Sequence, residues 1–446
     1  MGRCQRLGYL GAGAFVFTAA CGPSIEVEDG GTGDLPGDST GATTAMSSLE
    51  GEGEGEGEGE ADTTTSNPVD TSVDDTGGPA LTNLVDIFFV VDNSGSMGEE
   101  QGVFATATAT LVARLDELDV DYRIGMTTTD NSNPWCPGTT PEAGQFRLSS
   151  CRSRLNEFTF SGAVMIDASD VGCLDVCGAE MLNVTPTPDE AGQMAQRPWI
   201  EVTDGVSNID GLSVAEALAC AIPQGINGCG FEQPLESLHK AIGRTNNDDE
   251  PAYGFFRPGS LRVVVVVSDE ADCSYQDESI FLPDGPRTFW SLPEEGSPTS
   301  AVCWHAGVGC SNGDCFPVDL DPGGADTNDA SAVMFPVSRY TASFQALEDD
   351  AKTVTPGADL LMALIGGFNS DGSVTYADAV DPEFMDNFGI GPGCSSELGE
   401  AVPMVRLLAV AQAFDTGDAV ATHSICEEHQ SAMTSLGDRI AASLGR

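Results

Sequence analysis

The sequence predicts an α/β fold: a doubly wound, mostly parallel sheet flanked by helices and carrying Cys-rich, disulfide-stapled insertions. Two observations predict it. Nearly continuous apolar runs, such as Leu84 to Asp92 and the five valines from Val263 to Val267, are typical of parallel strands buried on both faces. Stretches with helical spacing separate these runs, as the crossover connections of a parallel sheet require.

The elements follow in chain order from about residue 81. Strands are expected at Leu84 to Asp92, Tyr122 to Thr129, Leu261 to Asp269 and Asp359 to Gly366, and helices at Gly102 to Leu118, Leu235 to Arg244, Ser338 to Lys352, Met404 to Phe414 and Glu427 to Leu444. Two stretches rich in Cys, Gly and Pro, about 130–229 and 273–336, are too long for simple loops, and we interpret them as insertions that decorate the sheet. The expected folded domain is 81–446.

Residues 1–20 have the composition of an export signal. Arg3 and Arg6 precede an apolar stretch that is too short to cross a bilayer. The segment Thr18 to Gly22 resembles a lipoprotein cleavage box, which implies that Cys21 becomes a lipidated N-terminus on the outer membrane, at its periplasmic or cell-surface face. Cleavage near Ala20 without lipidation is the alternative.

Residues 21–80 differ sharply in composition from the rest of the chain. They are mainly Gly, Thr, Ser, Asp and Glu with hardly an aromatic residue, and 51–60 are five Gly-Glu repeats. Such a segment buries too little apolar area to offset the entropy cost of ordering. We expect a disordered acidic tether between the anchor and the domain.

The net charge of −52 excludes a general affinity for nucleic acid or anionic lipid. Membrane contact is therefore expected only through the N-terminal lipid. The two lysines, Lys240 and Lys352, do not follow a glycine, so the chain has no phosphate-binding P-loop.

The cysteines agree with export. Of the 14, Cys4 lies in the signal and Cys21 in the cleavage box, which leaves an even number for disulfides in an oxidising compartment. We expect the pairs Cys136–Cys151, Cys173–Cys177, Cys220–Cys229, Cys310–Cys315, Cys273–Cys303 and Cys394–Cys426. Zinc binding by some of these cysteines is the weaker alternative.

The segment Asp92-Asn93-Ser94-Gly95-Ser96 follows the first strand directly. In doubly wound sheets, ligands bind outside the carboxyl ends of the strands. One carboxylate and two hydroxyls at that place are hard oxygen donors that suit Mg²⁺, Mn²⁺ or Ca²⁺. A plain turn is the alternative interpretation.

This D-x-S-x-S loop and the later strand that ends in Val267-Ser268-Asp269 resemble the metal-ion-dependent adhesion site (MIDAS) of von Willebrand factor type A (VWFA) domains. The resemblance covers roughly residues 84–445. It implies that Ser94 and Ser96 bind a divalent ion directly, Asp92 directly or through water, and Asp269 mainly through water. It also implies a protein partner that presents a Glu or Asp side chain to the ion.

Other segments, such as Gly228 to Glu236, resemble exported VWFA lipoproteins of delta-proteobacteria such as the myxobacteria. Within that segment the chain departs from the family, because Glu232 stands where a threonine ligand is expected. Glu232 either replaces that ligand or only favours the N-terminal end of the next helix. With Glu270 or Asp272 also nearby, the protein itself could cancel the charge of the ion and weaken the capture of a partner's acid.

The sequence favours cell adhesion or another binding role over an enzyme. The histidines form no H-E-x-x-H pair and the loop serines lack a G-x-S-x-G setting; the four are His239, His305, His423 and His429. A metal-dependent hydrolase is the remaining enzymatic alternative. The other rival is a calcium-stabilised surface protein without a specific partner, to which acidic loops such as 319–329 could add cation sites.

Overall fold

The computed structural model describes residues 82–161, 165–189, 192–414 and 421–446. The expected signal, Cys21 and the acidic tether lie outside these ranges. Across the described ranges, no helix is long and apolar enough to cross a membrane.

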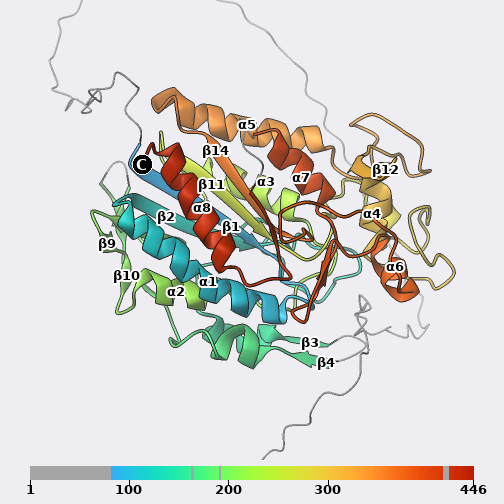
Figure 1. The fold of residues 1–446 in the computed structure, drawn as a ribbon, viewed down its shortest axis with the longest axis horizontal. Helices are drawn as coiled ribbons and strands as arrows, with labels where there is room; N and C mark the ends of the chain where they lie inside the picture. The colour runs from blue at the N-terminus through green and yellow to red at the C-terminus, as the bar shows by residue number, and fades with distance from the viewer. Residues whose placement is uncertain (1–81, 162–164, 190–191, 415–420) are drawn as a thin grey trace, which may run out of the picture. The chain divides into compact units, whose positions relative to one another are not determined.

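A seven-stranded sheet forms the centre of the domain (Figure 1). Its strand order is β17-β14-β11-β1-β2-β8-β9, and the first five of these run parallel to one another. β8 pairs antiparallel with β2, and β9 with β8. The predicted α/β class with a mostly parallel sheet is therefore confirmed. The strands are β1 (Leu84–Val91), β2 (Asp121–Thr128), β8 (Ile200–Thr203), β9 (Val206–Ser207), β11 (Leu261–Val267), β14 (Leu360–Gly366) and β17 (Ala421–Ser424).

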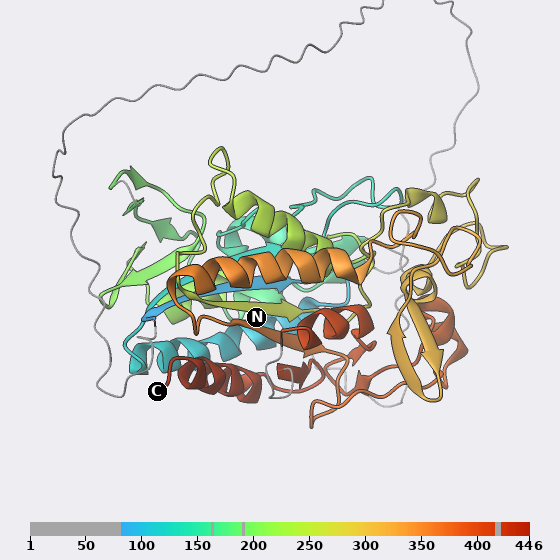
Figure 2. The same ribbon diagram turned by 90° about the horizontal axis from the view of Figure 1, so that it is seen from above.

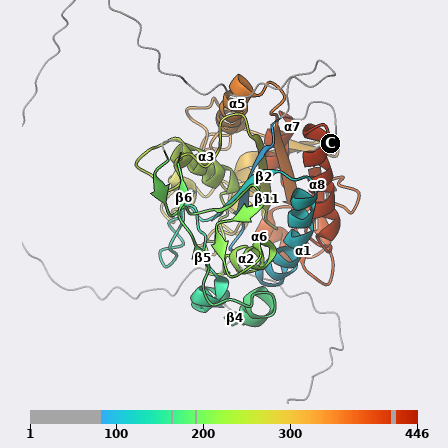
Figure 3. The ribbon, with the colours of Figure 1, turned by 90° about the vertical axis from the view of Figure 1, so that its left-hand side faces the viewer.

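Helices cover both faces of the sheet, as Figures 2 and 3 show. One face packs against α1 (Gly98–Glu117), α2 (Val214–Ala221) and α8 (Gln430–Ser443). The other packs against α3 (Pro234–Thr245), α5 (Val337–Val354) and α7 (Val405–Gln412). Two short helices, α4 (Ala301–Gly307) and α6 (Pro382–Phe388), lie beyond the end of the sheet (Figure 1).

The central strand shows why its sequence is apolar without alternation. Along β1, Ile87 and Phe89 enter the core under α1, whereas Phe88 and Val90 enter the core under α3. Successive side chains of a strand point to opposite faces, and both faces are buried here. An apolar residue is therefore favoured at each position from Ile87 to Val91, whereas Asp86 is buried in an ion pair with Arg257.

β1 has two neighbours in the sheet. β2, the next strand of the sheet along the chain, lies on one side of β1, and β11 lies on the other. In such sheets a crevice opens outside the carboxyl ends of the strands, where the order reverses. Asp92 and Asp269 follow the ends of β1 and β11, and Asp92 N donates a hydrogen bond to Val267 O at 2.9 Å. The fold therefore brings these two predicted site residues to one place.

Part of the first Cys-rich stretch belongs to the sheet itself, because β8 and β9 extend it and α2 packs on α1. These elements and the edge strand β17 were not predicted from the sequence. The other short elements are η1 (Cys151–Phe158), β3 (Thr159–Ser161), β4 (Met165–Asp167), η2 (Asp170–Leu174), β5 (Asn183–Val184), β6 (Thr187–Pro188), β7 (Met194–Ala195), β10 (Ile209–Asp210), η3 (Glu278–Ile280), β12 (Val308–Ser311), β13 (Asp314–Pro317), β15 (Cys394–Ser395) and β16 (Glu400–Ala401).

Half of the predicted disulfide pairing is correct. The pairs formed as predicted are Cys273–Cys303, Cys310–Cys315 and Cys394–Cys426. The predictions Cys136–Cys151, Cys173–Cys177 and Cys220–Cys229 are wrong, because these cysteines pair as Cys136–Cys229, Cys151–Cys173 and Cys177–Cys220. With all of these cysteines in disulfides, the zinc alternative is also wrong.

The topology explains the error. The first Cys-rich stretch begins after β2 and ends before α3. Gln233 N, just before α3, donates to Thr129 O at 3.1 Å, so the two ends of the stretch lie side by side. Cys136 therefore meets Cys229 across a separation of 93 residues, and closing so long a loop restricts the unfolded chain strongly.

We predict that His429 makes the domain less stable in acid. His429 precedes α8, is only 1% exposed and lies 5.7 Å from Phe104, ring centroid to ring centroid. Burial, and then repulsion from His423, lower its pKa from 6.5 to about 4. Because the unfolded state binds this proton more tightly, stability is lost as pH falls between these two values, by up to roughly 3 kcal/mol.

His429→Phe keeps a ring against Phe104 and does not titrate. Denaturant titrations at about pH 7 and about pH 4.5 should show a smaller loss of unfolding free energy in this variant than in the wild type. An equal loss in both proteins contradicts this account of His429.

Candidate metal centre

The D-x-S-x-S loop follows β1 and leads into α1. Ser94 N donates a hydrogen bond to Asp92 Oδ1 at 2.8 Å, and Ser94 Oγ lies 3.1 Å from Ser96 Oγ. Met97 N also donates to Ser94 O, so the segment is a turn as well. The turn draws the two serine hydroxyls together beside the Asp92 carboxylate.

The end of β11 supplies the second side of the site. Ser268 Oγ donates to Asp92 Oδ2 at 2.5 Å and thereby joins the two strand ends. Asp269 comes next and lies within hydrogen-bonding reach of Ser96. Ser268 was not predicted as a site residue, although its place directly before Asp269 could have suggested this role.

Glu232 enters from the loop before α3. Its carboxylate is fully buried and accepts a short hydrogen bond on Oε2 from Thr129 Oγ1, at the end of β2. Its backbone O accepts a hydrogen bond from Cys273 N at 2.7 Å, which fixes this loop against the segment after β11. A threonine therefore does contact Glu232, but it directly follows β2 and does not come from the loop where the family pattern places it.

Five residues predicted from the sequence thus gather in one place: Asp92, Ser94, Ser96, Glu232 and Asp269. That they bind a metal stays a prediction. Asp92 and Glu232 are fully buried, Ser94 is 2% exposed and Asp269 is 6% exposed. Only Ser96 is partly accessible, so any opening to the site lies on its side.

Three further carboxylates are buried beside these residues; one of them, Asp130, repels Glu232 but accepts backbone hydrogen bonds on both of its oxygens. Glu270 directly follows Asp269, and Glu100 lies in the first turn of α1. Asp272 behaves differently, because Arg406 Nε lies 2.9 Å from Asp272 Oδ2 and cancels its charge. Glu100 was not predicted; its position four residues after Ser96, one helical turn away, is the signal that could have found it.

We call Asp92, Glu100, Glu232, Asp269 and Glu270 the acid cluster. Burial is the largest cause that raises the pKa of each of them, and repulsion between the carboxylates raises all but Asp92 further. The pKa of Asp269 rises to about 7 and that of Glu100 to about 9. Within the described ranges, no Lys or Arg side chain forms an ion pair with any of the five.

Three oxygens of the acid cluster are buried without a hydrogen-bond partner: Glu100 Oε2, Glu232 Oε1 and Asp269 Oδ1. A buried, unpartnered carboxylate oxygen is costly. A hard divalent cation would supply both the missing partner and the missing charge, so the residues present fit such an ion.

Among the described residues, no group of three or more His, Cys, Asp and Glu side chains is arranged to hold a metal ion. The D-x-S-x-S loop places two serine hydroxyls beside the carboxylates. This is the mixed donor set that the D-x-S-x-S motif offers.

Gln101 holds the loops in place. Its Nε2 donates to Asp92 O and to Gly225 O, both at 2.7 Å, and its Oε1 accepts from Gln224 N at 2.7 Å. The side chain is fully buried on α1. One residue thus connects the D-x-S-x-S loop to the chain that leads toward Glu232.

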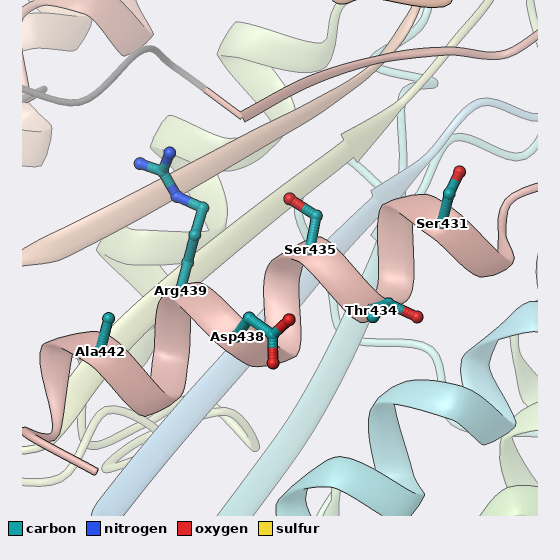
Figure 4. Close-up of a pocket in the computed structure, with 6 residues that line it drawn as sticks. All are labelled: Ser431, Thr434, Ser435, Asp438, Arg439 and Ala442. Carbon is teal, nitrogen blue, oxygen red and sulfur yellow. The ribbon is translucent and has the colours of Figure 1, made fainter.

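A shallow groove on the surface of α8 is a different place (Figure 4). All six lining residues come from that one helix: Ser431, Thr434, Ser435, Asp438, Arg439 and Ala442. No second element supplies groups that converge on this groove, so it is not a candidate site.

No protein-family model matches the chain, and the search of curated proteins found no match. Among solved structures, the chain is similar to the pilus adhesin SpaC from Lactobacillus rhamnosus GG in its open conformation, with a TM-score of 0.33 and 10% identity. That match covers 81% of this chain and 30% of the adhesin chain, so this chain spans less than a third of its length. A second SpaC structure gives a TM-score of 0.27 at the same identity and coverage. Likenesses this weak carry no argument about function.

We predict that Glu232→Gln stabilises the protein when divalent ions are removed. The variant can still accept the hydrogen bond from Thr129, but it no longer places a charge beside Asp92 and Glu270. Thermal unfolding with a chelator at about pH 8 should show a melting temperature higher by a few degrees.

Asp272→Asn is the matched control. It removes an equally buried carboxylate that Arg406 already neutralises, so it should lower the melting temperature. If Glu232→Gln also lowers the melting temperature, repulsion within the acid cluster does not destabilise the ion-free protein.

Proposed function

We propose that the chain is a binding protein in which a VWFA-like domain holds Mg²⁺ or Ca²⁺ at the D-x-S-x-S loop and uses that ion to bind a protein partner. The observation that carries the proposal is the acid cluster: five buried carboxylates, three of them with an unpartnered oxygen, and none paired with a cationic side chain of the residues that the structure describes. Two serine hydroxyls converge at the same place.

The fold supports a VWFA-like, doubly wound arrangement. The sheet is mostly parallel, helices cover both faces, and the candidate site lies where the chain leaves β1 in one direction and β11 joins in the other. That is the place where such sheets bind ligands.

In the proposed site, Ser94 and Ser96 bind the ion through their hydroxyls. Asp92 is held by Ser268 and stays in place whether or not it touches the ion directly. Asp269 and Glu232 supply negative charge, and Glu232 takes the role of the family's threonine with Thr129 fixing one of its oxygens. The bound ion would offer a coordination position to a partner's carboxylate.

A second candidate function follows from the same burial. A divalent ion carries two positive charges, and the acid cluster can carry up to five negative ones. An ion neutralised in this way would stabilise the domain without attracting an acidic partner. A melting temperature that rises with Ca²⁺ or Mg²⁺, with no capture of an acid, would favour this calcium-stabilised structural protein.

We propose an exported location with a lipid on Cys21. The six disulfides support it, because disulfides persist in oxidising compartments. In this arrangement the acidic segment 21–80 separates the domain from the outer membrane. The chain binds protein rather than nucleic acid, and we propose no catalytic residue.

The test is the binding of a carboxylate probe by the intact, disulfide-bonded chain. An immobilised acetyl-Ala-Glu-Ala-amide peptide should bind the wild type with Mg²⁺ or Ca²⁺ present and release it when a chelator is added. The double variant Asp92→Ala, Ser94→Ala should not bind. Absence of chelator-sensitive binding by the wild type contradicts ion-mediated capture.

The variant Glu232→Thr tests whether Glu232 cancels part of the charge of the ion. Removing one carboxylate leaves the ion less neutralised, so the variant should bind the ion less tightly but the probe several-fold more tightly once the ion is bound. Glu99→Gln is the control, because Glu99 is exposed on the same helical turn as Glu100 and should change neither property much. Weaker probe binding by ion-saturated Glu232→Thr speaks against charge cancellation by Glu232.

A further inference from the structure

Ala168 and Val171, from the first Cys-rich stretch, pack directly on the start of α1. A Cβ atom at Gly98 would lie 2.6 Å from Ala168 Cβ, and one at Gly102 would lie 2.2 Å from Val171 O. These glycines are four residues apart and therefore share one face of the helix. The disulfide Cys151–Cys173 joins the two ends of the segment that contains both residues. The segment is thus fixed against the helix that the D-x-S-x-S loop begins.

The same segment places an aromatic ring on the D-x-S-x-S loop. Phe160, on β3, has ring atoms 3.2 Å from the position that a Cβ atom at Gly95 would take. Gly95 lacks a side chain, so the Phe160 ring occupies the space beside the middle of the loop. Ile166 on β4 is the cross-strand neighbour of Phe160 and lies on the same face of this strand pair. Both side chains are partly exposed.

The burial of the site limits the direction from which a partner can approach, and the Phe160 ring lies on that side. Asp92, Ser94 and Glu232 are almost inaccessible, whereas Gly95 and Ser96 are partly exposed. A carboxylate that reaches the ion must therefore approach beside Gly95, and its flanking groups must pass along Phe160. A partly exposed aromatic face gains free energy when an apolar group covers it.

We propose that Phe160 is a specificity-determining residue: it contacts the partner beside the captured acid, so that the site prefers a Glu or Asp flanked by apolar side chains on an extended segment. This inference rests on the proposed function, because the ion is what holds the acid. Ile166 extends the apolar contact along the same face. The Cys-rich stretch thereby forms one wall of the binding site.

The test compares two probes on the intact chain with saturating Mg²⁺: acetyl-Ala-Glu-Ala-amide and acetyl-Leu-Glu-Leu-amide. The wild type should bind the leucine probe about five- to tenfold more tightly, as expected for a few tens of Å² of apolar contact. Phe160→Ala should bind both probes equally, and Phe160→Leu should recover most of the preference.

Two controls separate a local effect from loss of the fold. Phe160 supplies no oxygen ligand, so the Mg²⁺ affinity of Phe160→Ala, measured by calorimetry, should match the wild type. Met165 neighbours Ile166 on β4, points to the opposite face of the strand pair and is 77% exposed. Met165→Ala should therefore keep the wild-type preference.

Different results overturn the inference in distinguishable ways. If the wild type binds both probes with chelator sensitivity and Phe160→Ala keeps the same ratio, Phe160 does not determine specificity and the proposed function survives. If Met165→Ala loses the preference as Phe160→Ala does, the contact is not on the Phe160 face. If the wild type binds neither probe while it still binds Mg²⁺, ion-mediated capture fails and the inference fails with it.

Discussion

Five carboxylates are buried at one end of the sheet, and no cationic side chain in the described part of the chain pairs with them. The rest of the candidate site depends on this constraint. Each of these groups would be more stable in water, and their charges repel one another. Other buried acids in the described ranges have partners: Arg406 pairs with Asp272, Arg257 pairs with Asp86, and Asp130 accepts two backbone hydrogen bonds. The exception therefore needs a reason, and a bound divalent cation supplies one.

The remaining structure holds these groups together against their repulsion. The apolar strands β1 and β11 fix the two positions from which the Asp92 and Asp269 loops begin, at the buried centre of the sheet. Gln101 connects the D-x-S-x-S loop to the chain before Glu232, and the disulfide Cys136–Cys229 closes that part of the chain. Because the site is preorganised in this way, the free-energy cost of bringing the charges together arises when the chain folds. An ion would then find its ligands already in position.

The sequence predicted the parts of this arrangement that depend on local pattern. The apolar runs located β1, β2, β11 and β14, and the D-x-S-x-S motif located the loop. The sequence did not predict a site role for Thr129, Ser268 or Glu100, because each of them interacts with a site residue that lies on another element. The three wrong disulfides have a related cause: Cys136 pairs with Cys229 across the 93-residue stretch, and the cysteines between them pair with each other, so pairing does not follow nearness in sequence. The edge strand β17 has the sequence Ala-Thr-His-Ser, which contains no apolar run from which a strand could be predicted. It forms by pairing with the edge of β14.

Calorimetric titration of the intact, disulfide-bonded chain with Mg²⁺ and with Ca²⁺ tests the central claim most directly. The account predicts saturable binding of at least one of these ions by the wild type, and loss of that binding in the double variant Asp92→Ala, Ser94→Ala. Absence of binding in the wild type, or equal binding in the variant, would contradict it, because the acid cluster would then be buried without the cation that explains it.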